Sequence, residues 1–138
     1  MVEFIPVQPF EVDILEPEAV EYLDRASGEI HGYFSSKHAL DAAKAGAGML
    51  FKAQENGILG CFYISFRQYP VGRVMSVILL GGRDFESWGV QLHEFLTALA
   101  LKNGAVEFTM MGRKGWAKIF PDFEHLACIY RKRLISAV

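Results

Sequence analysis

The spacing of hydrophobic and polar residues changes along this chain, and the changes predict its elements. Residues 49–54, 58–66 and 73–80 are short apolar runs rich in aromatic, β-branched and aliphatic residues, and turn residues separate them. The first turn contains Asn56-Gly57, a pair that accepts the positive φ angles of a tight hairpin. Three runs of strand length joined by short turns predict three consecutive antiparallel strands.

A helical pattern follows the third run. Apolar residues recur every three or four positions, at Phe85, Trp88, Leu92, Phe95, Leu96 and Leu99. We expect Asp84 to be the N-cap and Gly104 to end the helix. Residues 105–110 then alternate as a strand does. A helix between two strands predicts a crossover, which places both strands in one sheet.

The N-terminal part is expected to hold an edge strand and two helices. Residues 10–14 alternate between apolar and acidic positions after Pro9, which is typical of an edge strand. Pro17 suits the first position of a helix that ends at Gly28. Ser35 is expected to cap a second, alanine-rich helix that ends near Gly46.

The C-terminal part predicts a short helix over residues 116–120, which Pro121 ends, and a last strand within residues 126–134. The whole order predicts one α+β domain over residues 1–138. Its sheet would be mixed and mostly antiparallel, with six or seven strands and about four flanking helices.

Composition excludes some classes of function. The chain has 138 residues, of which 51% are hydrophobic, so a packed core is expected. A formal charge of −2 gives no general attraction for nucleic acids or anionic membranes. No apolar run approaches the roughly 18 residues of a membrane span. Cys61 and Cys128 lie in apolar runs and match no metal spacing, so we expect free thiols in a reducing, cytoplasmic compartment.

The connection between the third apolar run and the long helix is the main candidate site. Gly81, Gly82 and Arg83 place backbone amides and one guanidinium at a helix N-terminus, where anions bind in sheets of this kind. The alternative is a plain tight turn, which would need glycine for positive φ. Arg113 and Lys114 precede the short helix expected over residues 116–120, on the same expected edge of the sheet. They are therefore further candidate ligand contacts. The alternative for these two residues is a solvated loop.

The order of strand, two helices, three-strand meander, glycine turn, long helix, strand, short helix and last strand resembles the GCN5-related N-acetyltransferase fold. The resemblance covers roughly residues 10–135. The run Gly-Arg-Lys-Gly-Trp at residues 112–116 also resembles small acetyltransferase-like proteins of bacteriophages and prophages. The resemblance implies an acyl-CoA site with acetyl-CoA as cofactor, and transfer of the acyl group to an amine.

The chain departs from the family pattern at two places. The family's pyrophosphate loop reads Q/R-x-x-G-x-G/A, whereas here a glycine pair and Arg83 stand directly before Asp84, and Glu86 adds a second negative charge. The family's usual general base is a glutamate on the preceding strand, or a water held there. In this chain that strand, residues 73–80, has only Ser76 as an uncharged polar residue. No catalytic residue is therefore assigned, and a water is expected to accept the proton. The alternative function is a catalytically inactive relative that acts as a binding or assembly module, with a second copy or a phage protein as partner.

Overall fold

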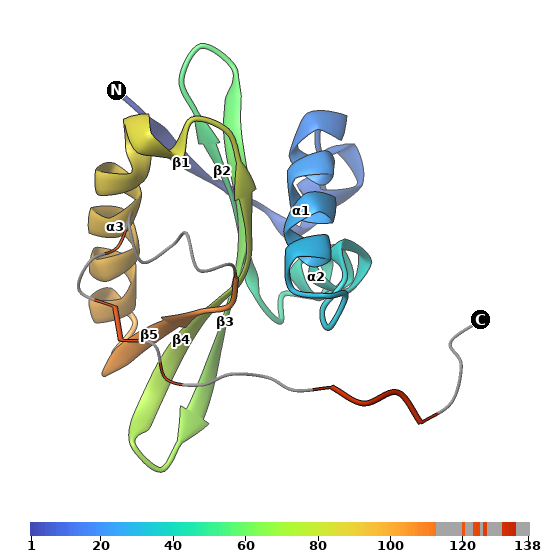
Figure 1. Ribbon diagram of the computed structural model, residues 1–138. Helices are drawn as coiled ribbons and strands as arrows, with labels where there is room; N and C mark the ends of the chain where they lie inside the picture. The colour runs from blue at the N-terminus through green and yellow to red at the C-terminus, as the bar shows by residue number, and fades with distance from the viewer. Residues whose placement is uncertain (113–119, 121–122, 125, 127–130, 135–138) are drawn as a thin grey trace.

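The computed structural model describes residues 1–112, 120, 123–124, 126 and 131–134 (Figure 1). In chain order its elements are β1 (Glu3–Val7), the 3-10 helix η1 (Pro9–Ile14), α1 (Pro17–Glu29), α2 (Ser36–Lys44), β2 (Met49–Gln54), β3 (Ile58–Tyr69), β4 (Gly72–Gly82), α3 (Phe85–Lys102) and β5 (Glu107–Met110).

The strands form one mixed sheet in the spatial order β1-β2-β3-β4-β5. Neighbouring strands are antiparallel, except that α3 crosses over and brings β5 alongside β4 in parallel. The expected meander and crossover are therefore confirmed. The expected six or seven strands is wrong, because the described residues form five. The helix expected over residues 116–120 and the strand expected within 126–134 fall largely outside the described residues.

The first fifteen residues differ from the expectation. The edge strand is β1, which contains Pro6, and the alternating residues 10–14 form η1 instead. Local capping explains the difference. Pro9 has the fixed φ that suits the first position of a helix, and the Glu11 carboxylate accepts a hydrogen bond from the Gln8 amide at 3.0 Å. These local contacts outweigh an alternation that is only three apolar residues long.

The expected end of the first helix at Gly28 is wrong, because α1 continues to Glu29 and its C-cap is Ile30. Two other predicted ends are confirmed. The Ser35 hydroxyl caps α2 by accepting a hydrogen bond from the His38 amide at 3.1 Å. The hairpin between β2 and β3 has φ values of 52° at Asn56 and 115° at Gly57, so both residues use the left-handed region that the turn requires.

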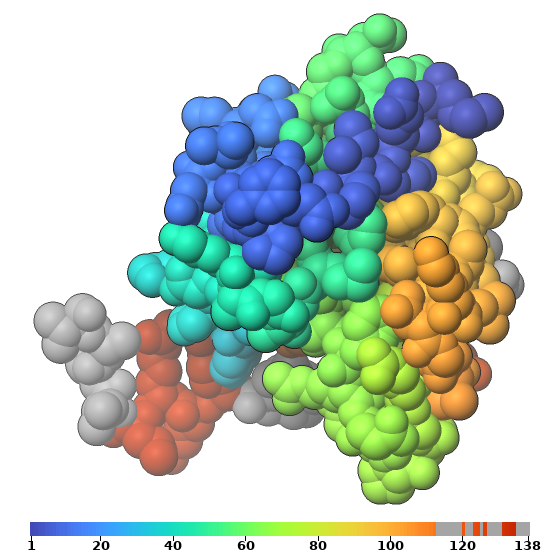
Figure 2. All heavy atoms as spheres, turned by 180° about the vertical axis from the view of Figure 1, so that it is seen from behind, coloured from blue at the N-terminus to red at the C-terminus, as the bar shows by residue number. Residues whose placement is uncertain are grey.

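Helices cover both faces of the sheet (Figure 1). α1 and α2 pack on one face, around a core that includes Tyr22 and Leu23, and α3 packs on the other, around Phe62 and Trp88. Residues 58–65 of β3 are all buried because the strand is covered on both sides. The β3–β4 hairpin, by contrast, projects beyond the helices, as the view from behind also shows (Figure 2).

The core on the α1 side contains Cys61, whose side chain is fully buried. Burial raises the pKa of this thiol to about 12. Because the thiolate is the reactive form, we expect iodoacetamide at about pH 8 to leave Cys61 unmodified in the folded protein. In denaturant it should react fully. The measurement is mass spectrometry of a Cys128→Ser variant, since Cys128 lies outside the described residues. Equal labelling rates in the folded and denatured states would contradict the expectation.

Candidate functional site

β4 contains a bulge at Ile78. In the register with β3, Leu79 pairs with Tyr63 but Val77 pairs with Ile64, so Ile78 is an extra residue. The bulge changes which face the side chains take. Ile78 and Leu79 both belong to the core on the α1 side, whereas Val77 belongs to the core under α3. A bulge re-aims the strand and interrupts the ladder of hydrogen bonds at this point.

β4 and β5 part at the same place. β5 pairs with β4 only from Val74 to Val77, and the Met111 amide makes the last backbone hydrogen bond, to the Val77 carbonyl at 3.2 Å. Within the described part of the chain, residues 78–82 of β4 have no strand on this edge. Backbone N–H and C=O groups of alternate residues in this stretch therefore point toward the opening between the two strands.

Gly81 and Gly82 are the last residues of β4. The expected glycine turn is wrong, because neither residue has a positive φ; the left-handed residue is Asp84, with φ 55°. Close approach requires the glycines instead. A Cβ atom on Gly81 would lie 1.9 Å from the Tyr22 carbonyl oxygen, and one on Gly82 would lie 2.5 Å from that of Leu59. The backbone of α1 therefore lies directly on the end of β4.

A cavity of about 250 Å³ opens beside the two glycines. The second half of α1, the end of β4 and the start of α3 line it with Arg25, Ala26, Glu29, Leu80, Gly81, Gly82 and Phe85. Arg25 supplies a cation to this space, and its guanidinium also contacts the Glu21 carboxylate at 3.1 Å. Sequence reasoning missed Arg25, since only the packing of α1 on β4 brings this residue to the glycines.

Arg83 follows the glycines but does not line the cavity. Its guanidinium lies 3.0 Å from the Asp84 carboxylate. Partial burial favours the neutral form of the guanidinium, but contacts with Asp84 and the Tyr22 hydroxyl outweigh it and raise the pKa of Arg83. The positive charge of Arg83 is thus compensated by its neighbour in the chain.

The start of α3 is held by contacts other than the expected cap. Asp84 occupies the N-cap position, but its side chain makes no capping hydrogen bond. Instead the Ser87 amide and hydroxyl both donate to the Asp84 carbonyl at 2.8 Å. The buried Trp88 indole donates to the Arg83 carbonyl at 2.7 Å. A helix whose first-turn amides receive no side-chain cap is suited to binding an anion.

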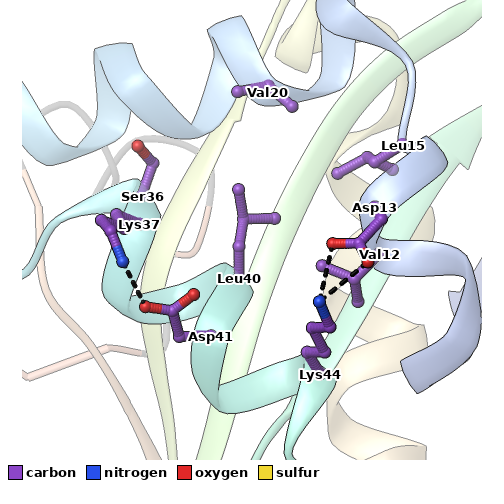
Figure 3. A pocket seen from close by; sticks show the side chains of 9 residues that line it. All are labelled: Val12, Asp13, Leu15, Val20, Ser36, Lys37, Leu40, Asp41 and Lys44. Carbon is purple, nitrogen blue, oxygen red and sulfur yellow. Dashed lines mark hydrogen bonds and ion pairs between the residues drawn. The ribbon is translucent and has the colours of Figure 1, made fainter.

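A larger hollow of about 380 Å³ lies between η1, α1 and α2 (Figure 3). Four charged side chains border it, and they pair with one another. Lys37 contacts Asp41 at 2.7 Å, and Lys44 contacts Asp13 at 2.8 Å. Arg25 at the smaller cavity is paired as well, with Glu21, so charge does not separate the two spaces. They differ in that no glycine lines the larger hollow. We therefore take the smaller cavity, at the end of β4, as the candidate site.

The structure brings only some of the predicted site residues together. Gly81, Gly82 and Arg83 are consecutive at the candidate site, whereas Arg113 and Lys114 lie outside the described residues. Among the described residues there is no group of three or more histidine, cysteine, aspartate or glutamate side chains that could hold a metal ion. The same part of the chain has no helix that is both long and apolar enough to span a membrane.

No family model matches the sequence, and no curated protein matches it either. Solved structures do match in fold. A predicted acetyltransferase from Clostridium acetobutylicum, crystallised with acetyl-CoA, superposes with a TM-score of 0.69 at 11% identity, over 97% of each chain. A GCN5-related N-acetyltransferase from Ralstonia eutropha JMP134 gives 0.71 at 9% identity, over 96% of this chain and 99% of that one.

A ribosomal-protein-alanine N-acetyltransferase from Brucella melitensis biovar Abortus 2308 gives a TM-score of 0.63 at 14% identity, over 99% of each chain. Together these matches confirm the expected fold, an α+β arrangement like that of GCN5-related N-acetyltransferases with a mostly antiparallel sheet. The likeness to bacteriophage and prophage proteins stays a prediction.

The contact between α1 and the end of β4 can be tested with two glycine substitutions. Gly81→Ala should lower the free energy of unfolding by about 3 kcal/mol or more, because the new methyl group meets the Tyr22 backbone. Gly28→Ala is the control. It lies in α1, where an added Cβ meets nothing within 4 Å, so it should raise stability by up to about 1 kcal/mol. Urea denaturation measures both, and similar effects of the two substitutions would contradict the close approach.

Proposed function

We propose that this chain is an acetyltransferase that takes the acetyl group from acetyl-CoA and transfers it to an amine. The parting of β4 and β5 at the Ile78 bulge carries the proposal, because it opens the sheet beside a cavity with glycine backbone on its wall. The fold supports the proposal, since the structural neighbours with this fold are acetyltransferases and one of them was crystallised with acetyl-CoA.

The residues at the end of β4 fit a phosphorylated cofactor. Gly81 and Gly82 line the cavity with backbone, and no side chain caps the first turn of α3 beside it. Arg25 faces the same cavity from α1. Arg83 can add a second cation if it leaves Asp84, and Arg113 and Lys114 remain candidates from outside the described residues. We propose these residues as the ones that would hold the pyrophosphate.

The unpaired edge of β4 supplies the groups that act on the transferred acyl unit. Bound acetyl-CoA would supply the reactive thioester. N–H groups along residues 78–82 can orient and polarise a carbonyl oxygen that lies in the opening. β4 carries no carboxylate or imidazole, and Ser76 is its only uncharged polar side chain. We therefore propose that a water, and no charged side chain of β4, accepts the proton of the amine.

The negative charges around the site work against this binding. Asp84 and Glu86 stand at the start of α3, and Glu29 lines the cavity. A carboxylate beside a bound phosphate opposes it, and each such charge at a helix start is worth about 0.3–1 kcal/mol. We expect binding of acetyl-CoA to be weaker than a glycine-rich loop with free cations would give.

A second function has one observation in its favour. Phe10 and Ile14 on η1 expose 83% and 77% of their surface, and Val12 between them lines the larger hollow. This favours a catalytically inactive relative that binds another protein, either a second copy or a different partner. Such a protein would keep the scaffold without binding the cofactor.

Thermal melting with and without millimolar acetyl-CoA separates the two functions. A ligand at 100 times its dissociation constant adds about 2.7 kcal/mol to stability, and this should raise the melting temperature by several degrees. Sodium acetate at the same concentration is the control. An unchanged melting temperature would remove the enzyme proposal. The melting temperature could rise while a peptide with a free N-terminal alanine causes no release of the coenzyme A thiol. That result would mean that the protein binds acetyl-CoA but does not acetylate this peptide.

Charge substitutions test where the cofactor lies. Arg25→Gln and Arg83→Gln should each weaken acetyl-CoA binding, by about tenfold where the guanidinium contacts phosphate. Asp84→Asn should strengthen binding about two- to fivefold, because it removes a negative charge from the start of α3 and releases Arg83. Arg73→Gln is the matched control, since Arg73 lies over the Phe66 ring at 4.7 Å, on the β3–β4 hairpin. Isothermal titration measures the four affinities, and equal losses for Arg25 and Arg73 would contradict the assignment.

A further inference from the structure

The 3-10 helix η1 presents two large apolar side chains to the solvent, those of Phe10 and Ile14. Phe10 is the most exposed aromatic residue in the part of the chain that the structure describes. Neither side chain belongs to a core cluster, so packing within one copy does not account for them. Single exposed apolar residues are common on protein surfaces, but two on one short helix form a patch that a partner can cover.

The larger hollow lies next to this patch (Figure 3). Val12, which stands between the two exposed residues in η1, lines it. Three further apolar side chains line it as well, those of Leu15, Val20 and Leu40. The chain therefore has a projecting apolar side chain and an apolar hollow side by side on one surface.

Contacts at two points hold η1 in place. The Glu11 carboxylate accepts a hydrogen bond from the Gln8 amide at the start of η1. The Asp13 carboxylate pairs with Lys44, which ties η1 to α2 across the hollow. A side chain on a segment that is already ordered adds little ordering cost when a partner buries it, so the position of Phe10 favours binding.

The charges around the hollow indicate the kind of partner. Two lysines and two aspartates border it, and each lysine pairs with an aspartate of the same copy. The rim therefore has no net formal charge. A strongly charged partner such as a nucleic acid gains no attraction there. A second copy brings the same balanced rim, so it meets no net repulsion and can place acids opposite bases.

This surface is complementary to itself. In a two-fold dimer both copies use the same surface, so a side chain that fits the hollow of the other copy does so twice. We propose that two copies of this chain pair through η1 and α2, and that Phe10 of each copy enters the hollow of the other. The pairing names the partner in the alternative function, but it does not require an inactive protein, because different residues line the cavity at the end of β4.

The size of the surface sets the expected strength of the dimer. Its members are the two exposed residues of η1 and the nine residues that line the hollow. A standard interface uses roughly 20–30 residues on each side. We therefore expect a weak and reversible dimer, with a dissociation constant on the order of 10–100 μM.

Sedimentation equilibrium of the full chain, between about 1 μM and 1 mM, tests the pairing. The average mass should rise from that of one chain to that of two. Phe10→Ser should weaken association about 100-fold, because it removes two contacts that are each worth about tenfold. Leu101→Ser is the matched control. Leu101 is 71% exposed on α3, which packs on the opposite face of the sheet, so this variant should associate like the original chain.

Mixing two variants tests whether Phe10 enters the hollow. Val20→Glu places a carboxylate in the hollow, and Val20 belongs to no core cluster, so the variant should fold. Each of Phe10→Ser and Val20→Glu should pair poorly with itself. Their mixture should pair only about tenfold more weakly than the original chain, because Phe10 of one variant meets the unchanged hollow of the other. Urea denaturation checks that both variants are folded.

Two results would overturn the proposal. A chain that stays monomeric over the whole concentration range would leave the hollow to a different protein or a small apolar molecule. A mixture that pairs no better than either variant alone would mean that Phe10 does not enter the hollow. These measurements use no acetyl-CoA, so a failed dimer and a failed cofactor test are separate outcomes.

Discussion

The contact between the α1 backbone and the end of β4 is the constraint on which the rest of the site depends. The Tyr22 carbonyl lies so close to Gly81 that no side chain fits between them. On the other face the Trp88 ring packs against Gly60 and Gly82, where an added Cβ atom would lie 2.8 Å and 3.1 Å from it. The end of β4 is therefore held between a helix backbone and an indole ring. This arrangement sets the distance of α1 from the sheet, and with it the width of the cavity that Arg25 enters.

The bulge at Ile78 gives the same strand a second property. Before Ile78 in the chain, β4 is an inner strand with a paired strand on each side. After Ile78, one edge of β4 has no paired strand among the described residues. A single inserted residue thus separates a part of β4 that holds the sheet together from a part whose backbone groups are available to a ligand.

Much of the fold was accessible from sequence because local chemistry and periodicity agreed. The Asn56-Gly57 turn, the Ser35 cap and the apolar stripe of α3 each have one structural reading. The site was less accessible. Gly81 and Gly82 indicate a special backbone position. The sequence does not distinguish a glycine required for close approach of another backbone from one required for a positive φ. Arg25 carries no signal at all, since its relation to the glycines exists only after α1 packs on β4. Residues 10–14 misled because capping at Pro9 outweighed their alternation.

The position of Pro6 has a consequence for the behaviour of the protein in concentrated solution. β1 is the outermost strand, and its free side could serve as a template for a strand of another molecule, leading to stacked, insoluble assemblies. A proline in a strand of only five residues removes one N–H donor from that short template. The same residue that sequence reasoning treats as a break in a strand thus helps keep neighbouring molecules apart.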